Sequence, residues 1–212
     1  MQKLDAVIFD YGNVLCLPPV DEDNEKMAEI VSVDRGNFEE AYWRFREEYD
    51  RGVTSNIEYW RQIAGYLNVE LSQEEIEKLT RMDVISWSRP NLQVVELLHN
   101  LVASGVKVAI LSNMPYDLKF WVEGECDWLP VFDHRTYSCE LKCVKPDKAI
   151  YEHCINGLNL PKNSMVFVDD RIENVEAARN CGIEAIHFTN NQILESYLRN
   201  FYVPTRKVPT FR

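Results

Sequence analysis

The chain has 212 residues, of which 46% are hydrophobic, and it carries 34 acidic against 23 basic residues, a formal net charge of −11. This length suits one large domain, or one domain with a modest insertion, and the apolar content suffices for a sizeable core. The acidic balance argues against a nucleic-acid or anionic-membrane partner, because such partners require a clustered basic surface.

No run of sequence approaches the ~20 apolar residues that span a bilayer, and the first residues lack the layout of a signal peptide. We therefore expect a cytoplasmic protein. We also expect it to be a monomer or a homodimer. The six cysteines form no C-x-x-C pair. This predicts free thiols in a reducing compartment.

The first predicted element is a short strand, Ala6 to Phe9, which runs into Asp10 and is followed by Gly12. A short apolar run that stops at a turn signal is typical of a buried strand that leads into a loop. An aspartate at the carboxyl end of such a strand lies where open α/β sheets bind ligands.

The segment 17–88 is predicted to be helical. Its aromatic and aliphatic residues recur at helical spacing, without the alternation that is typical of strands. Two capping-box signals, Asn37 with Glu40 and Ser72 with Glu75, mark helix starts. The predicted division is 1–16 and 89–203 for an α/β core, 17–88 for a small helical cap, and 204–212 for a C-terminal tail.

Beyond residue 89, strands and helices alternate. The strand candidates are Val106–Leu111, a weaker Val131–Tyr137, Met165–Val168 and Glu184–Phe188. Short, nearly all-apolar strands separated by helices are typical of a parallel sheet that is covered on both faces. The expected fold is therefore α/β, a Rossmann-like parallel sheet with helices on both faces and an all-helical cap inserted after the first strand.

Polar residues close three of these strands: Asp10, then Ser112 with Asn113, then Asp169 with Asp170. In a parallel sheet these ends share one edge and can converge. Three neighbouring carboxylates repel one another, which a divalent cation relieves, and all-oxygen ligands suit Mg²⁺. The sequence therefore predicts a magnesium site at this edge.

A lysine in the same region suits a phosphate group. Lys145 precedes a helix, and Ser112 and the backbone N–H groups after Asp10 can donate to phosphate oxygens. A carboxylate that attacks phosphorus forms an aspartyl-phosphate. Each residue alone also suits a turn, a helix cap or a solvated lysine, but their order along the chain indicates Mg²⁺-dependent phosphoryl transfer through Asp10.

This ordered set resembles the haloacid dehalogenase-like hydrolase superfamily over about residues 4–190. AVIFDYGNVL is similar to its first motif, in the form D-x-G-N-V, LSNM to its second, VKPDKAIY to its third and VFVDDRIENVEAAR to its fourth. The helical insertion resembles the small cap of one phosphatase-type branch. The resemblance implies a phosphatase of a small phosphorylated metabolite, and members with a similar first motif look like sugar-phosphate phosphatases.

The resemblance also implies a role for each site residue. The implied catalytic residues are Asp10 as nucleophile, Lys145 and Ser112. The implied metal ligands are Asp10, the carbonyl of Gly12, Asp169 and Asp170. The implied phosphate contacts are Ser112, Asn113, Lys145 and Gly12.

One position departs from the family pattern. Most family phosphatases have a second aspartate two residues after the nucleophile, where this chain has Gly12, which cannot transfer a proton. General acid–base catalysis typically contributes 10²–10⁴-fold. Either turnover is slow, or another group serves, such as a cap carboxylate (Asp21 or Asp23) or an acidic leaving group like that of a sugar 1-phosphate.

Two alternative functions stay open. A 2-haloacid dehalogenase would attack carbon with the same aspartate and need no metal, and the pair Asp169–Asp170 speaks against it. A weakly catalytic or non-catalytic binder of a phosphorylated ligand would explain Gly12.

Overall fold

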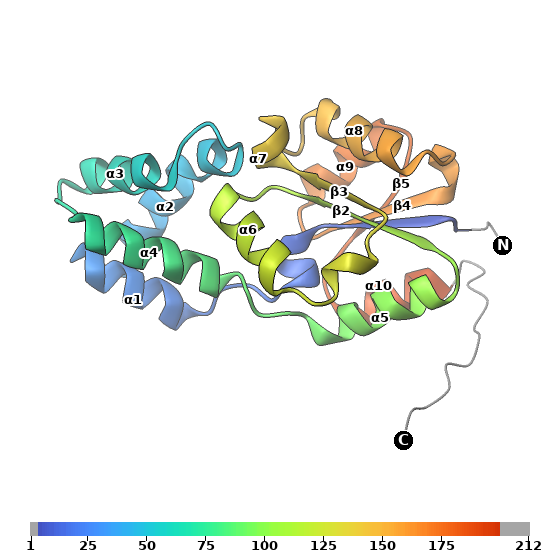
Figure 1. Ribbon diagram of the computed structural model, residues 1–212, viewed down its shortest axis with the longest axis horizontal. Coiled ribbons are helices and arrows are strands. Elements are labelled where there is room, and N and C mark those ends of the chain that lie inside the picture. The colour runs from blue at the N-terminus through green and yellow to red at the C-terminus, as the bar shows by residue number, and fades with distance from the viewer. Residues whose placement is uncertain (1–3, 200–212) are drawn as a thin grey trace, which may run out of the picture.

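The computed structural model describes residues 4–199. The predicted tail 204–212 and the last residues of the predicted core, 200–203, lie outside this part of the chain. Figure 1 places a helix-covered sheet beside a separate group of four helices, with the chain passing twice between them.

The sheet has five parallel strands in the order β3-β2-β1-β4-β5. The strands are β1 (Ala6–Phe9), β2 (Lys107–Ser112), β3 (His134–Tyr137), β4 (Met165–Asp169) and β5 (Glu184–His187). The central strand β1 pairs with β2 and β4, so that Phe9 is level with Ile110 and Val168. The polar residues that follow these strands therefore leave the sheet at one edge, and the α/β fold expected from the sequence is confirmed.

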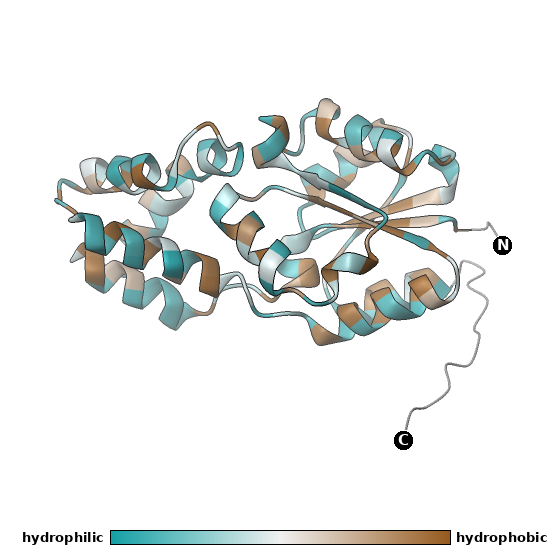
Figure 2. Ribbon diagram, viewed as in Figure 1, coloured by the Kyte–Doolittle hydropathy of each residue, from teal (hydrophilic) through white to brown (hydrophobic). Residues whose placement is uncertain are grey.

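Both faces of the sheet are buried. Ala6 and Ile8 pack in one hydrophobic cluster, and Val7 and Phe9 pack in the other. Helices α8 (Lys148–Leu158) and α9 (Ile172–Asn180) cover the first face, and α5 (Leu92–Ala103), α6 (Tyr116–Glu125) and α10 (Asn191–Arg199) supply the other cluster (Figure 1). Two-sided burial explains why the three central strands, β1, β2 and β4, are almost wholly apolar, whereas the edge strands β3 and β5 include polar residues. Figure 2 shows brown segments at the centre of the sheet.

Short elements complete the core. They are η1 (Tyr11–Leu15), η2 (Leu129–Val131), α7 (Ser138–Leu141) and η3 (Lys162–Ser164). The weaker strand candidate was expected from Val131, but β3 begins only at His134. The preceding residues form the 3₁₀ turn η2, which begins with Leu129 and Pro130. A proline lacks the N–H group that a strand ladder needs, so the turn rather than the strand occupies this segment.

The insertion after β1 consists of α1 (Asp21–Val31), α2 (Arg35–Asp50), α3 (Asn56–Leu67) and α4 (Gln73–Ser86). These four helices, which we call the cap, enclose a hydrophobic cluster of their own. Trp60 and Phe38 stack at the centre of that cluster, with ring centroids 6.4 Å apart. The four helices therefore pack around one core, and this packing fixes where each side chain of the cap lies relative to the other three helices.

Helix starts in the cap follow side-chain capping. Ser72 and Glu75 form the expected capping box at α4. The expected box at Asn37 is wrong, because α2 begins one turn earlier. There, the Asp34 side chain accepts a hydrogen bond from the Asn37 backbone N–H at 3.1 Å and caps the helix. An aspartate is as good an N-cap as an asparagine, so the earlier of the two sites prevails.

Among residues 4–199, no helix has both the length and the apolar character that crossing a bilayer requires. All six cysteines are free thiols in this structure, as expected from the sequence.

The packing of the cap core gives a stability prediction. Phe38 is fully buried, and Phe38→Ala is expected to lower the free energy of unfolding by about 3–5 kcal/mol, measured by urea denaturation. Phe120 is 63% exposed on α6, and Phe120→Ala serves as the control, with a change within about 0.5 kcal/mol. Equal effects of the two substitutions would contradict a packed cap core.

Candidate functional site

Asp10 and Asp169 lie at the same edge of the sheet, directly beside each other. β1 and β4 are in register, and the Asp10 backbone N–H donates to the Val168 carbonyl at 2.9 Å. The Lys145 ammonium group joins the two side chains, 2.8 Å from Asp10 Oδ1 and 2.7 Å from Asp169 Oδ2. All three residues are buried, so this lysine is the counter-charge that allows two carboxylates to lie inside the protein.

Backbone and amide donors hold the acidic residues in place. Asp169 accepts from the Arg171 backbone N–H at 2.9 Å and from the Asn174 side chain at 3.0 Å. Asp170 Oδ2 accepts from Asn13 Nδ2 at 2.7 Å. Asn13 adopts a positive φ of 57°, which asparagine tolerates better than most residues. The turn after β1 therefore also orients a carboxylate that follows β4.

The electrostatics of this edge are unfavourable without a cation. Burial raises the pKa of Asp10 to about 7, and Asp169 and Asp170 raise it too, whereas Lys145 opposes the shift. Burial likewise raises the pKa of Asp170. One ammonium group thus only partly compensates three neighbouring carboxyl groups.

Oxygen atoms of Asp10, Asp169 and Asp170 lie within 4.8 Å of one another. This donor set, all oxygen and short of positive charge, fits a hard divalent cation such as Mg²⁺. Asn13 Oδ1 is buried without a hydrogen-bond partner in the described chain. Ordered water around a cation, or a ligand, would satisfy such an atom.

The other predicted phosphate contacts divide into two groups. Asn113 lines the pocket beside Lys145 and exchanges two hydrogen bonds with its backbone, at 2.8 and 3.1 Å. Gly12 also lines the pocket. Ser112 ends β2 at the same sheet edge but is 1% exposed, and it is not among the lining residues. The structure brings Asp10, Gly12, Asn113, Lys145 and Asp170 to one pocket, with Asp169 directly behind Lys145.

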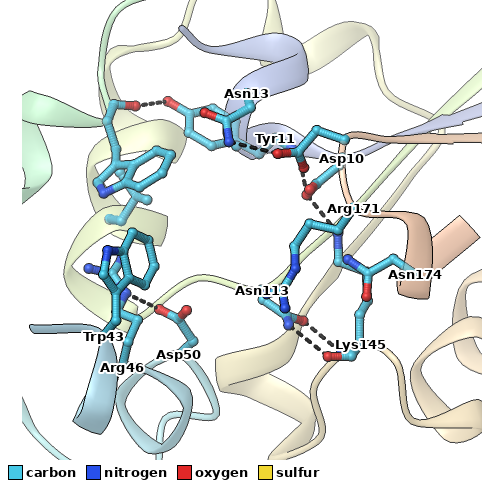
Figure 3. Close-up of a pocket in the computed structure, with 14 residues that line it drawn as sticks. Asp10, Tyr11, Asn13, Trp43, Arg46, Asp50, Asn113, Lys145, Arg171 and Asn174 are labelled. Atoms are coloured by element: carbon cyan, nitrogen blue, oxygen red, sulfur yellow. Dashed lines mark hydrogen bonds and ion pairs between the residues drawn. The ribbon is translucent and has the colours of Figure 1, made fainter. Parts of the chain in front are cut away.

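The pocket is a cavity of about 130 Å³ between the core and the cap (Figure 3). Its cap wall consists of Trp43, Arg46 and Asp50 from α2, with Trp87 just after α4. Trp43 is 56% exposed, and its ring meets the ring of Trp87 edge to face, with centroids 6.4 Å apart. The wall therefore combines two indole rings with one cationic and one acidic group.

A buried polar cluster fixes this wall. Arg46 Nε is 2.7 Å from Asp50 Oδ1, and Arg46 Nη1 is 3.0 Å from Asp83 Oδ1. Tyr42 donates to Asp83 at 2.6 Å and accepts from the Trp87 indole N–H at 3.1 Å. Because Arg46 contacts carboxylates on two helices, its position ties α2 to α4.

Asp50 is the residue of the cap wall that sequence reasoning missed. Asp50 is the last residue of α2, and nothing in the pattern of that helix distinguishes it from the neighbouring surface carboxylates. The carboxylates proposed from the sequence lie elsewhere. Asp21 is exposed and pairs with Arg35, and Asp23 accepts from the Val20 backbone and pairs with Arg89.

Comparison with known proteins confirms the family that the sequence resembles. The family model for haloacid dehalogenase-like hydrolases matches residues 4–182. The chain is 27% identical to a sesquiterpene phosphatase of Aspergillus oryzae, over 88% of this chain and 90% of that protein. It is 26% identical to a phosphorylated carbohydrates phosphatase of Thermotoga maritima, over 87% of this chain and 84% of that protein.

Among solved structures, the fold is similar to that of a HAD family enzyme from Bacteroides thetaiotaomicron. That structure, of an Asp-to-Ala mutant, is a complex with magnesium and inorganic phosphate. The TM-score is 0.71 at 19% identity, covering 86% of this chain and 93% of the other.

The ion pairs of Lys145 give a prediction about stability. In metal-free buffer at neutral pH, Lys145→Met is expected to lower the free energy of unfolding by about 3–5 kcal/mol, because two buried carboxylates lose their counter-charge. Lys148→Met is the matched control, since that side chain is 76% exposed, and it should change stability by less than about 0.5 kcal/mol. Denaturant titration measures both, and a loss below 1 kcal/mol at Lys145 would contradict the assignment.

Proposed function

Since this chain belongs to the haloacid dehalogenase-like hydrolase family, we propose that it is a Mg²⁺-dependent phosphatase that uses Asp10 as its nucleophile. The substrate is a small phosphorylated metabolite, of which a sugar phosphate suits the pocket best. The observation that carries this proposal is the convergence of Asp10, Asp169, Asp170 and Lys145 at the core side of one pocket.

The residues perform the following steps. An oxygen of Asp10 attacks phosphorus, and a bond between them forms as the bond from phosphorus to the leaving oxygen breaks. Lys145, which already contacts Asp10, keeps that carboxylate ionised and donates to a phosphoryl oxygen. Asn113 and the backbone at Gly12 line the space where the phosphoryl group sits. Water then cleaves the aspartyl-phosphate and releases phosphate.

A bound Mg²⁺ would neutralise the carboxylates and polarise a phosphoryl oxygen. Asp10, Asp169 and Asp170 would hold it, together with the backbone carbonyl of Gly12. The raised pKa of Asp10 supports a cation at this position. A buried carboxyl group with a pKa near neutrality is partly protonated, and a nearby cation stabilises its ionised, reactive form.

The cap wall supports a sugar phosphate over a long apolar phosphate. The exposed indole ring of Trp43, which meets buried Trp87 edge to face, can pack against the C–H surface of a sugar ring. Arg46 and Asp50 offer a donor and an acceptor for hydroxyl groups. A sesquiterpenyl chain offers no hydroxyl group to the pocket-facing atoms of this pair, and burying such a polar atom without a partner is unfavourable. The similarity to the carbohydrate phosphatase of Thermotoga maritima points the same way.

The test is phosphate release from a panel of sugar phosphates, other small phosphate esters and a sesquiterpenyl phosphate, with Mg²⁺ and with EDTA. Wild type is expected to hydrolyse at least one sugar phosphate in Mg²⁺ alone. Asp10→Asn is expected to lose about 10³-fold or more of that rate. Asp21→Asn, on an exposed side chain of α1, should keep the wild-type rate. Metal-independent turnover that persists in Asp10→Asn would overturn the proposal.

The same preparation separates the two alternatives. Chloride release from a 2-haloacid in EDTA would establish dehalogenase chemistry in place of phosphatase chemistry. Mg²⁺ binding without hydrolysis of any ester in the panel would instead favour a phospho-ligand binder.

Metal binding is tested separately by titration calorimetry. Asp170→Asn is expected to weaken Mg²⁺ binding by at least about tenfold, since even the groups that orient metal ligands contribute 10–100-fold. Asp147→Asn, a partly exposed carboxylate outside the pocket, should leave the affinity unchanged. Equal affinities for wild type and Asp170→Asn would contradict the assigned ligand set.

A further inference from the structure

Asp50 is the single carboxylate that lines the pocket outside the acidic cluster, within residues 4–199. The pocket includes three acidic residues, Asp10, Asp50 and Asp170, and two of these belong to the cluster at the strand ends. Figure 3 shows Asp50 on the opposite wall, with its carboxylate directed into the open space. It lies on the cap side, where the leaving group of a phosphate bound at Asp10 would extend.

Position 12, directly after the strand-end loop residue Tyr11, lies against the indole ring of Trp87. Gly12 has φ −61° and ψ 132°, so its backbone does not itself demand glycine. A Cβ atom at this position would lie 3.4 Å from Cζ3 of Trp87. The indole ring of Trp87 thus borders position 12 on the cap side. Glycine carries no side chain that could transfer a proton, so the proton donor must come from another element.

We infer that Asp50 is the proton-transfer residue of this site. As the neutral acid it donates its proton to the leaving oxygen while the P–O bond breaks and the electron pair moves onto that oxygen. As the carboxylate it then removes a proton from the water whose oxygen attacks phosphorus, which releases phosphate, frees Asp10 and restores the acid. This inference rests on the phosphatase function proposed above and names the group that its chemistry lacks at Gly12.

The surroundings of Asp50 suit both its neutral acid form and its carboxylate form. The ion pair with Arg46 engages Oδ1, which leaves Oδ2 for a bound molecule. The Ser138 hydroxyl of α7 donates to the Asp50 backbone carbonyl and fixes the helix end. The Asp50 side chain is 15% exposed, so it is screened from bulk water but reaches the pocket.

The titratable groups that face Asp50 come from four elements. They are Arg46 on its own helix, Tyr59 on α3, Asp83 on α4 and Lys145 from the core. Burial, with a smaller contribution from Asp83, raises the pKa of Asp50 to about 6 against the opposing effects of Arg46 and Lys145. A group with a pKa near the working pH can both give and take a proton, which is the requirement for a general acid that becomes a base.

The experiment separates proton transfer from binding by varying the leaving group. Benzyl phosphate and 4-nitrophenyl phosphate are similar in size, but only the first has a leaving alkoxide that needs a proton. The value of kcat/KM reports steps up to departure of the leaving group, so it isolates the donation step. Wild type is expected to process both esters with kcat/KM values within about tenfold of each other.

Asp50→Asn should lose about 10²–10⁴-fold in kcat/KM for benzyl phosphate and less than about tenfold for 4-nitrophenyl phosphate. Asp34→Asn is the matched control. It makes the same substitution at the opposite end of α2, where asparagine caps as well as aspartate, and both rates should stay at wild-type values. Circular dichroism checks that each variant is folded.

The pH dependence gives a second readout that needs no variant. The ratio of kcat/KM for benzyl over 4-nitrophenyl phosphate cancels ionisations that both reactions share. Because only protonated Asp50 donates, this ratio should fall as the pH rises through about 6. In Asp50→Asn the ratio should be low and independent of pH.

The outcomes distinguish the two proposals. If Asp10→Asn abolishes turnover but Asp50→Asn affects both esters equally, the phosphatase assignment survives and the role of Asp50 is overturned. A wild-type preference for 4-nitrophenyl phosphate above about 10² also overturns it, even if Asp50→Asn does not fold. No turnover of these esters or of the panel by wild type overturns both.

Discussion

The contact on which the site depends is the pairing of the Lys145 ammonium group with Asp10 and Asp169, at 2.8 and 2.7 Å. Removing three charges from water is expensive unless each finds a partner. Here the parallel register of β1 and β4 places the two carboxylates side by side, and the lysine closes the gap from the segment before α8. The arrangement leaves excess negative charge, and that excess is what suits the edge to a divalent cation.

The cap depends on a second buried charge cluster. Arg46 contacts Asp50 and Asp83, on two helices, while Tyr42 joins the same group. These contacts fix the side of α2 that forms the pocket wall, so Trp43 and Asp50 face the core in a defined geometry. A rigid wall of this kind can position a proton donor, which a flexible loop would do less well. In this reading, loss of the aspartate at position 12 is offset by a carboxylate supplied from the cap.

The two walls divide the work of the proposed reaction. The core wall holds the phosphoryl group and its charge, and it is made of residues that follow strands. The cap wall meets the rest of the substrate with two indole rings and the Arg46–Asp50 pair. In the proposed reaction the core therefore supplies the nucleophile and the metal ligands, whereas the cap contacts the rest of the substrate and supplies the proton-transfer residue Asp50.

The sequence by itself determined the parallel α/β fold, the helical insertion and the order of Asp10, Lys145, Asp169 and Asp170 along the chain. Local patterns suffice there, because two-sided burial makes strands apolar and parallel strands end at one edge. It did not determine the N-cap of α2 at Asp34, the burial of Ser112 or the place of Asp50 in the pocket. These features depend on the packing of segments that are distant in the sequence. Trp87 lies over Gly12, and Arg46 is held between α2 and α4 by Asp50 and Asp83.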